Sequence, residues 1–331
     1  MNLHRNEFLD QHVIPDAYEY ASYMTKDTVT RMKAQLLDSL WKCSLDHEDL
    51  LFFHGSEDAL FKILMMAKIQ DYHHLVVAEQ AWAYYQTLGR NMKYQIHLVP
   101  PLEGQPLIMD EIACTQYLDT LDAAVVLMGY PDNPTGYRIE TFIERAKQYT
   151  HHLFLLDCTY QSPEDYAVTI QTIISASSNI IAITSVSKWF GLPGLRFGCG
   201  ISHVPWFRHL ELYLYFNPRV FHIVDKAISN VVYYKTLMAQ RNHIHHSLLE
   251  KEYQLLKLHI TPNLPFILVQ LCCPSPAKGV LEQFQLDHGV CLKLLNLQGI
   301  TFLRISTATN PEFVLMLETL LHNLEERLLK L

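Results

Sequence analysis

Short apolar runs of strand length alternate with helix-like segments over the first part of the chain. Three of these runs, residues 123–129, 153–157 and 180–186, are apolar along most of their length. Such runs are typical of strands covered on both faces, and they predict a mainly parallel sheet joined by helical crossovers. The same pattern predicts further strands at 50–54, 74–79 and 94–99 and helices at 26–41, 57–68 and 81–88.

The pattern changes after Val204. Residues 206–258 form a long helical stretch in which Pro218 is the main interruption. Beyond it we expect strands at 266–271, 289–292 and 301–305 and a closing helix at 311–329. This order indicates a smaller α+β domain after an α/β domain. We therefore predict an N-terminal arm over 1–25, a large domain over 26–215 and a small domain over 216–331.

Composition and charge exclude several classes of protein. Of the 331 residues, 49% are hydrophobic and 18% are charged, which excludes a disordered chain. Lys and Arg total 26 against 34 Asp and Glu, and the net charge of −8 argues against nucleic-acid binding. No apolar stretch approaches the ~20 residues that span a bilayer, and the first residues lack the apolar core of a signal peptide. We expect neither a nucleic-acid nor a membrane partner.

Cysteine and histidine usage points to a reducing compartment without a metal centre. The seven cysteines are odd in number and none forms a Cys-x-x-Cys pair, which favours free thiols and a cytoplasmic location. The 18 histidines cluster at 73–74, 151–152 and 243–246 without any His-Glu-x-x-His motif. We interpret them as solvated side chains and expect no metal site.

Three polar segments follow apolar runs, at the strand ends where open α/β sheets bind their ligands. They are residues 129–136, which contain Asn133-Pro-Thr-Gly; residues 156–160, which contain Asp157; and residues 185–198. Taken singly, the first is also a good turn, the Asp of the second also a helix cap, and a lone lysine in the third also a solvated charge. The combination is more informative than any one segment.

The third segment carries a distinctive set of groups. The hydroxyls of Ser185 and Ser187 and the guanidinium of Arg196 suit a phosphate, and Lys188 beside them suits a Schiff base. A cofactor with one phosphate and one aldehyde is pyridoxal 5'-phosphate. Its ring nitrogen needs a carboxylate, which Asp157 can provide, and its phenolic oxygen can accept from the amide of Asn133.

The order Asn-Pro-Thr-Gly, Asp-x-x-Tyr, Ser-x-Ser-Lys and Gly-Leu-x-Gly-Leu-Arg-x-Gly resembles the fold type I aminotransferases of class I/II. The resemblance implies a large domain with a mainly parallel seven-stranded sheet flanked by helices, a smaller α+β C-terminal domain and a homodimer. It also implies that Lys188 moves protons as acid and base, assisted by Asp157 and Tyr160.

The same resemblance assigns further roles. Backbone N–H groups of Ser56 and Glu57 would hold the cofactor phosphate, Trp82 would stack on the ring, and Tyr160 would contact the phenolic oxygen. Tyr23 would reach the phosphate of the partner subunit, and Arg304 would bind the substrate carboxylate. The alternatives are an ordinary helix start at Ser56, a core tryptophan at 82 and a surface arginine at 304.

Within the superfamily, the start at Leu3-His-Arg-Asn6-Glu7 and the short length are similar to the histidinol-phosphate aminotransferase branch, which also includes threonine-phosphate decarboxylases. Lys293 stands where that branch often has an arginine for the substrate, and Pro265 replaces a usual asparagine. We expect an aminotransferase of amino-acid biosynthesis, with an amino acid or histidinol phosphate as donor and a 2-oxo acid as acceptor. The alternatives are a threonine-phosphate type decarboxylase, a catalytically idle relative that binds the cofactor, and a plain α/β binding module.

Overall fold

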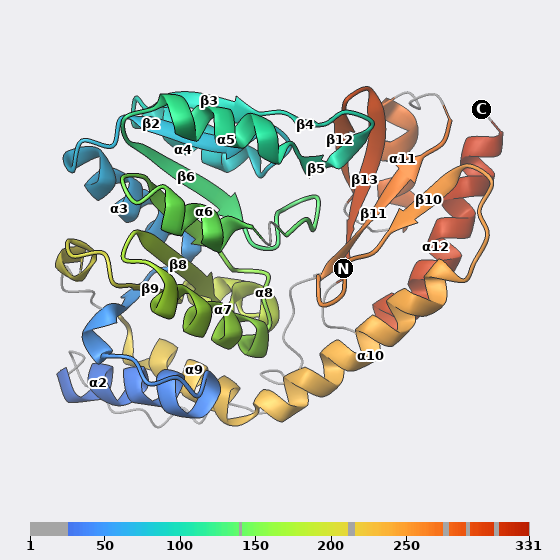
Figure 1. Cartoon of the computed structure of the whole chain (residues 1–331). Coiled ribbons are helices and arrows are strands. Elements are labelled where there is room, and N and C mark those ends of the chain that lie inside the picture. The colour runs from blue at the N-terminus through green and yellow to red at the C-terminus, as the bar shows by residue number, and fades with distance from the viewer. Residues whose placement is uncertain are drawn as a thin grey trace. The chain divides into compact units, whose positions relative to one another are not determined.

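The computed structural model describes residues 26–138, 141–210, 216–273, 278–288, 292–307 and 311–330 (Figure 1). The described chain divides into two compact units, one up to Val231 and the other from Val232 onward. The predicted arm over 1–25 lies outside the described residues, and the predicted boundary between 215 and 216 stays a prediction.

The first unit is built on a seven-stranded sheet with the order β1-β9-β8-β7-β6-β2-β3. Only β9 runs antiparallel to its neighbours among these strands, so the predicted mainly parallel sheet is confirmed. The strands are β1 (Leu50–Phe53), β2 (His74–Ala78), β3 (Gln95–Val99), β6 (Ala124–Gly129), β7 (Leu153–Asp157), β8 (Ile180–Ser185) and β9 (Gly198–Ser202).

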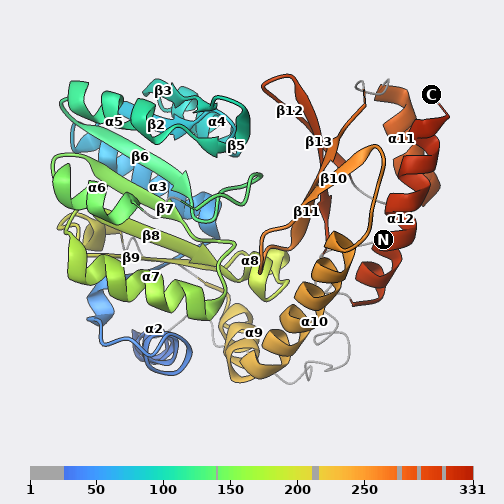
Figure 2. The same cartoon turned by 45° about the vertical axis from the view of Figure 1, so that its right-hand side comes forward.

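Helices cover both faces of this sheet, which explains why its central strands are apolar throughout. Strands β6 and β7 are buried at every position, and Figures 1 and 2 show α6 and α7 on one side of the sheet and α3 on the other. The helices are α2 (Lys26–Ala34), α3 (Ser56–Ile69), α4 (Ala83–Asn91), α5 (Glu111–Thr120), α6 (Phe142–Gln148), α7 (Pro163–Ala176), α8 (Val186–Trp189) and α9 (Pro218–Ser229).

Shorter elements complete the first unit. A π-helical segment continues α2, so the helix predicted over 26–41 changes its hydrogen-bond pattern part-way. A small hairpin follows β3 and was not expected from the sequence. These elements are η1 (Gln35–Leu40), η2 (His47–Asp49), β4 (Pro101–Leu102), β5 (Gln105–Met109), η3 (Pro193–Leu195) and η4 (Phe207–Leu210).

The second unit is a four-stranded antiparallel sheet with helices on one face. Its strand order is β10-β11-β13-β12, and Leu281, Phe284, Leu317 and Leu321 of two helices pack against Ile267 and neighbouring apolar residues of the sheet. Figure 2 shows the same two helices, α11 and α12, beside this sheet. The elements are α10 (Val231–Leu249), β10 (Leu256–His259), β11 (Phe266–Leu271), α11 (Lys278–His288), β12 (Leu292–Leu297), β13 (Ile300–Ser306) and α12 (Pro311–Leu329).

Two predictions for this region were wrong in detail. The helical stretch predicted over 206–258 ends at Leu249, and β10 begins within it because Leu256 and Leu258 pair with β11 instead of continuing a helix. The strand predicted over 289–292 runs over Leu292–Leu297, while residues 289–291 lie outside the described residues. The strands predicted over 266–271 and 301–305 and the closing helix are confirmed.

Candidate active site

The candidate site lies where several strands of the large sheet end. Gly129 at the end of β6 is paired with Asp157 at the end of β7. On β9, Gly198 is paired with Phe53 at the end of β1 and with Ser185 at the end of β8. The three polar segments found in the sequence therefore meet at one edge of one sheet, as expected for open α/β sheets.

Asp157 is a buried carboxylate with three donors. Its Oδ1 accepts from the backbone N–H of Thr159 at 3.1 Å and from the Thr159 hydroxyl at 2.5 Å, and its Oδ2 accepts from the Tyr85 hydroxyl at 3.0 Å. Burial raises the pKa of Asp157, while these donors and the charge of Lys188 act in the opposite direction. The three donors orient the carboxylate and stabilise its anionic form within the buried site.

Lys188 lies on α8, the short helix that follows β8. Its Nζ is 5.7 Å from the centroid of the Tyr160 ring, and Tyr160 itself is buried. Because the Lys188 charge lowers the pKa of Asp157, its amine is electrostatically coupled to that carboxylate. The predicted lysine, tyrosine and aspartate thus lie in one neighbourhood.

The N-terminus of α3 and Arg196 form a cradle for an anion. Helix α3 begins at Ser56 without a side-chain cap, so the first-turn N–H groups, including those of Ser56 and Glu57, have no acceptor within the helix. A Cβ placed on Gly55 would lie 2.7 Å from Nη2 of Arg196, so the guanidinium lies directly against the Gly55 backbone. Helix N-termini and guanidinium groups both favour phosphate.

The other side of the cradle is built from β8 and β9. Ser185 caps α8 by accepting from the N–H of Ser187 at 3.4 Å, and both serines are buried. A Cβ on Gly198 would lie 2.9 Å from the carbonyl carbon of Gly55 and 2.9 Å from the oxygen of Thr184. Glycine at 198 therefore allows the three strand ends to approach closely.

The backbone of Arg196 is in the left-handed region, with φ of 49°. This conformation is uncommon for a residue with a side chain, and here it ends η3, of which Arg196 is the C-cap. Nη1 of Arg196 also donates to the Pro193 oxygen at 3.4 Å. The tight turn after η3 thus directs the guanidinium toward Gly55.

Asn133 lies in a loop that closes on itself. The N–H of Asp132 donates to the Tyr137 oxygen at 2.8 Å, and the N–H of Gly136 donates to the Asp132 oxygen at 2.8 Å. Asp132 is buried, and its Oδ2 accepts from the Thr135 hydroxyl at 3.0 Å. At the other end, the N–H of Tyr130 donates to the oxygen of Asp157 at 2.8 Å, so the loop is attached to the site.

Trp82 lies at the start of α4 among other aromatic rings. Its ring centroid is 4.8 Å from that of Tyr84 and 5.6 Å from that of Tyr85, whose hydroxyl reaches Asp157. Trp82 is half-buried, so part of its surface stays available to a ligand.

Arg304 belongs to the second unit, and its position relative to the residues above is not described. Within its own sheet it is paired with Lys293 on β12 and Leu268 on β11, and its guanidinium stacks over the Phe266 ring at 4.2 Å. Two cations therefore lie opposite each other on neighbouring strands. Tyr23, the last predicted site residue, lies outside the described residues.

A sequence profile for aminotransferase class I and II matches residues 5–314. The chain belongs to this family. Histidinol-phosphate aminotransferase 2 of Oceanobacillus iheyensis is 26% identical over 206 residues, which are 60% of this chain and 51% of that protein. The chain thus spans about half the length of the curated relatives it matches.

Solved structures confirm the fold of this family member. The histidinol-phosphate aminotransferase of Clostridium acetobutylicum superposes with a TM-score of 0.71 at 15% identity, covering 91% of this chain and 90% of that one. The L-threonine-O-3-phosphate decarboxylase of Porphyromonas gingivalis superposes with a TM-score of 0.63 at 15% identity, covering 90% and 89%. The predicted fold type I architecture is therefore confirmed.

Sequence reasoning missed several groups of this aminotransferase-family site. Tyr85 and Thr159 were not assigned roles, although both donate to Asp157. The Tyr85 contact depends on which helices and strand ends meet, which no local motif encodes, whereas Thr159 lies two residues after Asp157. Gly198 belongs to the predicted glycine motif, but its contact with Gly55 was not predicted. Among the described residues, no group of three or more His, Cys, Asp or Glu side chains could hold a metal ion, and no helix is long and apolar enough to span a bilayer.

Proposed function

We propose that the chain is a pyridoxal-phosphate-dependent aminotransferase that transfers an amino group from an amino acid, or a similar amine such as histidinol phosphate, to a 2-oxo acid. The observation that carries the proposal is the meeting of Asp157, Lys188 and the Gly55–Arg196 cradle at one edge of the sheet. Membership of the class I and II family supports the same reaction.

The residues of the first unit fit this cofactor. The cradle suits a phosphate because the first-turn N–H groups of α3 and the Arg196 guanidinium are hydrogen-bond donors. Gly55 leaves room for the guanidinium, since a Cβ there would collide with it. When bound, the cofactor supplies an aldehyde that condenses with amines and a pyridine ring that withdraws electrons. Trp82 would cover the ring face, and Asn133 would donate to the phenolic oxygen.

Each remaining residue then has a definite task. Asp157 would hold a proton on the ring nitrogen as an anionic partner, and the donors Thr159 and Tyr85 and the charge of Lys188 favour that anion against the burial that raises its pKa. The Lys188 amine would attach the cofactor covalently and, once released, move a proton to and from the Cα of the substrate. Tyr160, whose ring lies near that amine, would contact the phenolic oxygen.

Arg304 and Lys293 suit a substrate with anionic groups. The guanidinium of Arg304 can bind a carboxylate through two parallel hydrogen bonds. Lys293, paired with it on the neighbouring strand, adds a second positive charge that can attract a second anionic group. An amine that carries a carboxylate or a phosphate fits these charges. Threonine phosphate is one such amine, and the L-threonine-O-3-phosphate decarboxylase of Porphyromonas gingivalis shares the fold. Decarboxylation is therefore the second candidate reaction.

The proposal includes a homodimer in the cytoplasm. The six cysteines of the described residues are free thiols, which accords with a reducing compartment. The dimer is expected from the family resemblance, and light scattering of the purified chain would give its mass.

The decisive experiment follows the visible absorbance of the bound cofactor after single additions of amino donors, including histidinol phosphate and threonine phosphate. An aminotransferase converts the band in one half-reaction, and a 2-oxo acid restores it; a decarboxylase releases carbon dioxide instead. Lys188→Ala is expected to lose the lysine-linked band and turnover while staying folded, and Lys147→Ala, an exposed lysine paired with Glu144, serves as the control. Turnover retained by Lys188→Ala would contradict the assigned role, and a wild-type band without any half-reaction would indicate an idle relative.

A further inference from the structure

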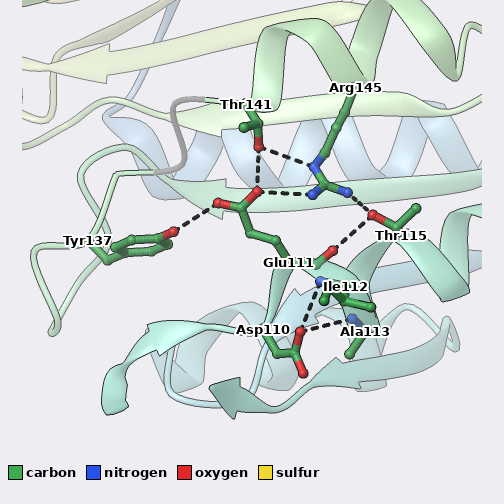
Figure 3. A network of polar contacts seen from close by, with 8 residues as sticks. All are labelled: Asp110, Glu111, Ile112, Ala113, Thr115, Tyr137, Thr141 and Arg145. Atoms are coloured by element: carbon green, nitrogen blue, oxygen red, sulfur yellow. Dashed lines mark hydrogen bonds and ion pairs between the residues drawn. The ribbon is translucent and has the colours of Figure 1, made fainter. Parts of the chain in front are cut away.

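The carboxylate of Glu111, on a helix beside the large sheet, binds the segment that follows the Asn133 loop. Glu111, the first residue of α5, accepts from the Tyr137 hydroxyl at 2.9 Å through Oε1. Its Oε2 accepts from the Thr141 hydroxyl at 2.5 Å and from Nη2 of Arg145 at 3.0 Å (Figure 3). One carboxylate therefore connects α5 both to the end of the loop and to the start of α6.

Glu111 is itself held in place. Nη1 of Arg145 donates to the Thr115 hydroxyl, and its Nε donates to the Thr141 hydroxyl at 3.3 Å. The Thr115 hydroxyl donates to the backbone carbonyl oxygen of Glu111 at 2.9 Å. Partial burial would raise the pKa of Glu111, but its donors outweigh that effect and the net pKa is lowered. The lowered pKa keeps the carboxylate ionised at neutral pH. Figure 3 shows the contacts that orient it.

Tyr137 transmits this anchoring to the loop. Its carbonyl oxygen accepts from the N–H of Asp132, the residue before Asn133, and its own N–H donates to the Thr135 hydroxyl at 3.2 Å. The Thr135 hydroxyl in turn donates to Asp132. The backbone of Asp132 before Asn133 and the side chain of Thr135 after it are therefore bonded to Tyr137, whose own side chain is bonded to Glu111.

We propose that Glu111 and Tyr137 are positioning residues that fix the Asn133 amide for hydrogen bonding to the cofactor. The inference rests on the proposed function and adds to it two residues on and beside α5. An amide on a loop keeps its hydrogen-bond geometry only where surrounding contacts restrict the loop, and small displacements weaken such bonds steeply. The Tyr137–Glu111 bond provides that restriction from the side opposite the Tyr130–Asp157 bond.

The chain contains a matched control. Tyr149, at the end of α6, donates its hydroxyl to Oδ1 of Asp119 on α5 at 2.6 Å. This is also a tyrosine–carboxylate bond between α5 and the α6 region, but within the described residues Tyr149 bonds to Asp119, Arg145, His152 and Asn179 and not to the Asn133 loop. Tyr149→Phe therefore removes the same chemistry and leaves the loop contacts in place.

The test measures pyridoxal phosphate binding by absorbance titration, and the pH midpoint of the bound cofactor's visible band, for the wild type, Tyr137→Phe, Glu111→Gln and Tyr149→Phe. If Tyr137→Phe misplaces the Asn133 amide, the hydrogen bond from that amide to the cofactor, about 0.5–1.5 kcal/mol, is lost, which predicts binding weaker by roughly 2- to 12-fold. The midpoint is expected to move to higher pH, because a misplaced amide no longer stabilises the ionised phenolic oxygen. Glu111→Gln should change both quantities in the same direction, and Tyr149→Phe should change neither.

The outcomes separate the two proposals. A wild-type protein that forms no visible band would overturn the proposed function and this inference with it. A normal wild-type band with unchanged affinity and midpoint in both Tyr137→Phe and Glu111→Gln would overturn the positioning role alone. Equal shifts in Tyr137→Phe and Tyr149→Phe would also overturn it, because they would reflect general loosening of α5 and α6.

Discussion

The carboxylate of Glu57 lies 3.4 Å from the Nη2 atom of Arg196, at the edge of the phosphate cradle. Both side chains are about half exposed, and the charge of Glu57 also contributes to the raised pKa of Tyr84, after the larger effect of burial. Glu57 therefore competes with a phosphate for the same guanidinium, although its backbone N–H is expected to help bind that phosphate.

Glu57→Gln is expected to strengthen binding of pyridoxal phosphate. Exposed ion pairs contribute roughly 0.2–1 kcal/mol, so the dissociation constant should fall by up to about fivefold, and less at high salt. Titration with pyridoxal phosphate at two salt concentrations measures this. Asp58→Asn is the control, since the Asp58 carboxylate binds Lys62 and the N–H of His54 instead of Arg196. Weaker binding by Glu57→Gln than by the wild type would contradict the competition.

Tyr85→Phe should destabilise the protein and alter the bound cofactor. Tyr85 is fully buried and donates to Asp157, so its loss leaves a buried carboxylate oxygen short of one donor and lowers the free energy of unfolding by about 1–3 kcal/mol. Tyr166→Phe is matched, because Tyr166 is equally buried and donates to the Ala182 oxygen. Urea unfolding should show similar losses, whereas only Tyr85→Phe should change the cofactor spectrum. Identical cofactor spectra for the two variants would show that Tyr85 does not influence the bound cofactor.

The pH dependence of stability should report on Asp132. Burial raises the pKa of Asp132 from 3.8 to about 6, although Thr135 and nearby N–H groups act against it. A carboxyl group with a raised folded-state pKa lowers stability when it is ionised, so its cost is absent at low pH, grows between about pH 4 and 6, and is complete above pH 6. Asp132→Asn should remove this cost.

The measurement is the unfolding free energy of wild type and Asp132→Asn between pH 4 and 8. The difference between them should move in favour of the variant as the pH rises and should level off above pH 6. A difference that stays constant over the whole range would show that the Asp132 carboxyl titrates normally.

The sequence predicted the parallel part of the large sheet well, because strands covered by helices on both faces must be apolar throughout. It did not predict β9, whose sequence Gly-Cys-Gly-Ile-Ser has little strand character and follows directly on the cradle segment. It also missed β10, since the Leu-Lys-Leu-His strand is short and follows a genuine helix that ends at Leu249. In both cases pairing with a neighbouring strand outweighs local propensity.

Site residues carried by contiguous motifs could be predicted, and residues recruited across the fold could not. Lys188, Ser185 and Arg196 stand within one segment, so their spacing alone indicated a cradle and a nucleophile. Tyr85 and Asp157 are 72 positions apart, and only the adjacency of β2, β6 and β7 brings them together. The predicted roles of Tyr160, Trp82 and Arg304 stay predictions until variants are measured.

Gly198→Ala tests whether close backbone approach builds the cradle. A methyl group there would lie 2.9 Å from both the Gly55 carbonyl carbon and the Thr184 oxygen, and these backbone atoms cannot move independently of β1 and β8. Such overpacking typically costs about 1–3 kcal/mol, and separating Gly55 from β9 should also weaken phosphate binding. Gly194→Ala is the control, because nothing lies within 4 Å of a Cβ at Gly194. Urea unfolding and pyridoxal phosphate titration of both variants provide the comparison, and a Gly198→Ala protein that matches Gly194→Ala in both measurements would show that the cradle tolerates a wider separation of its strands.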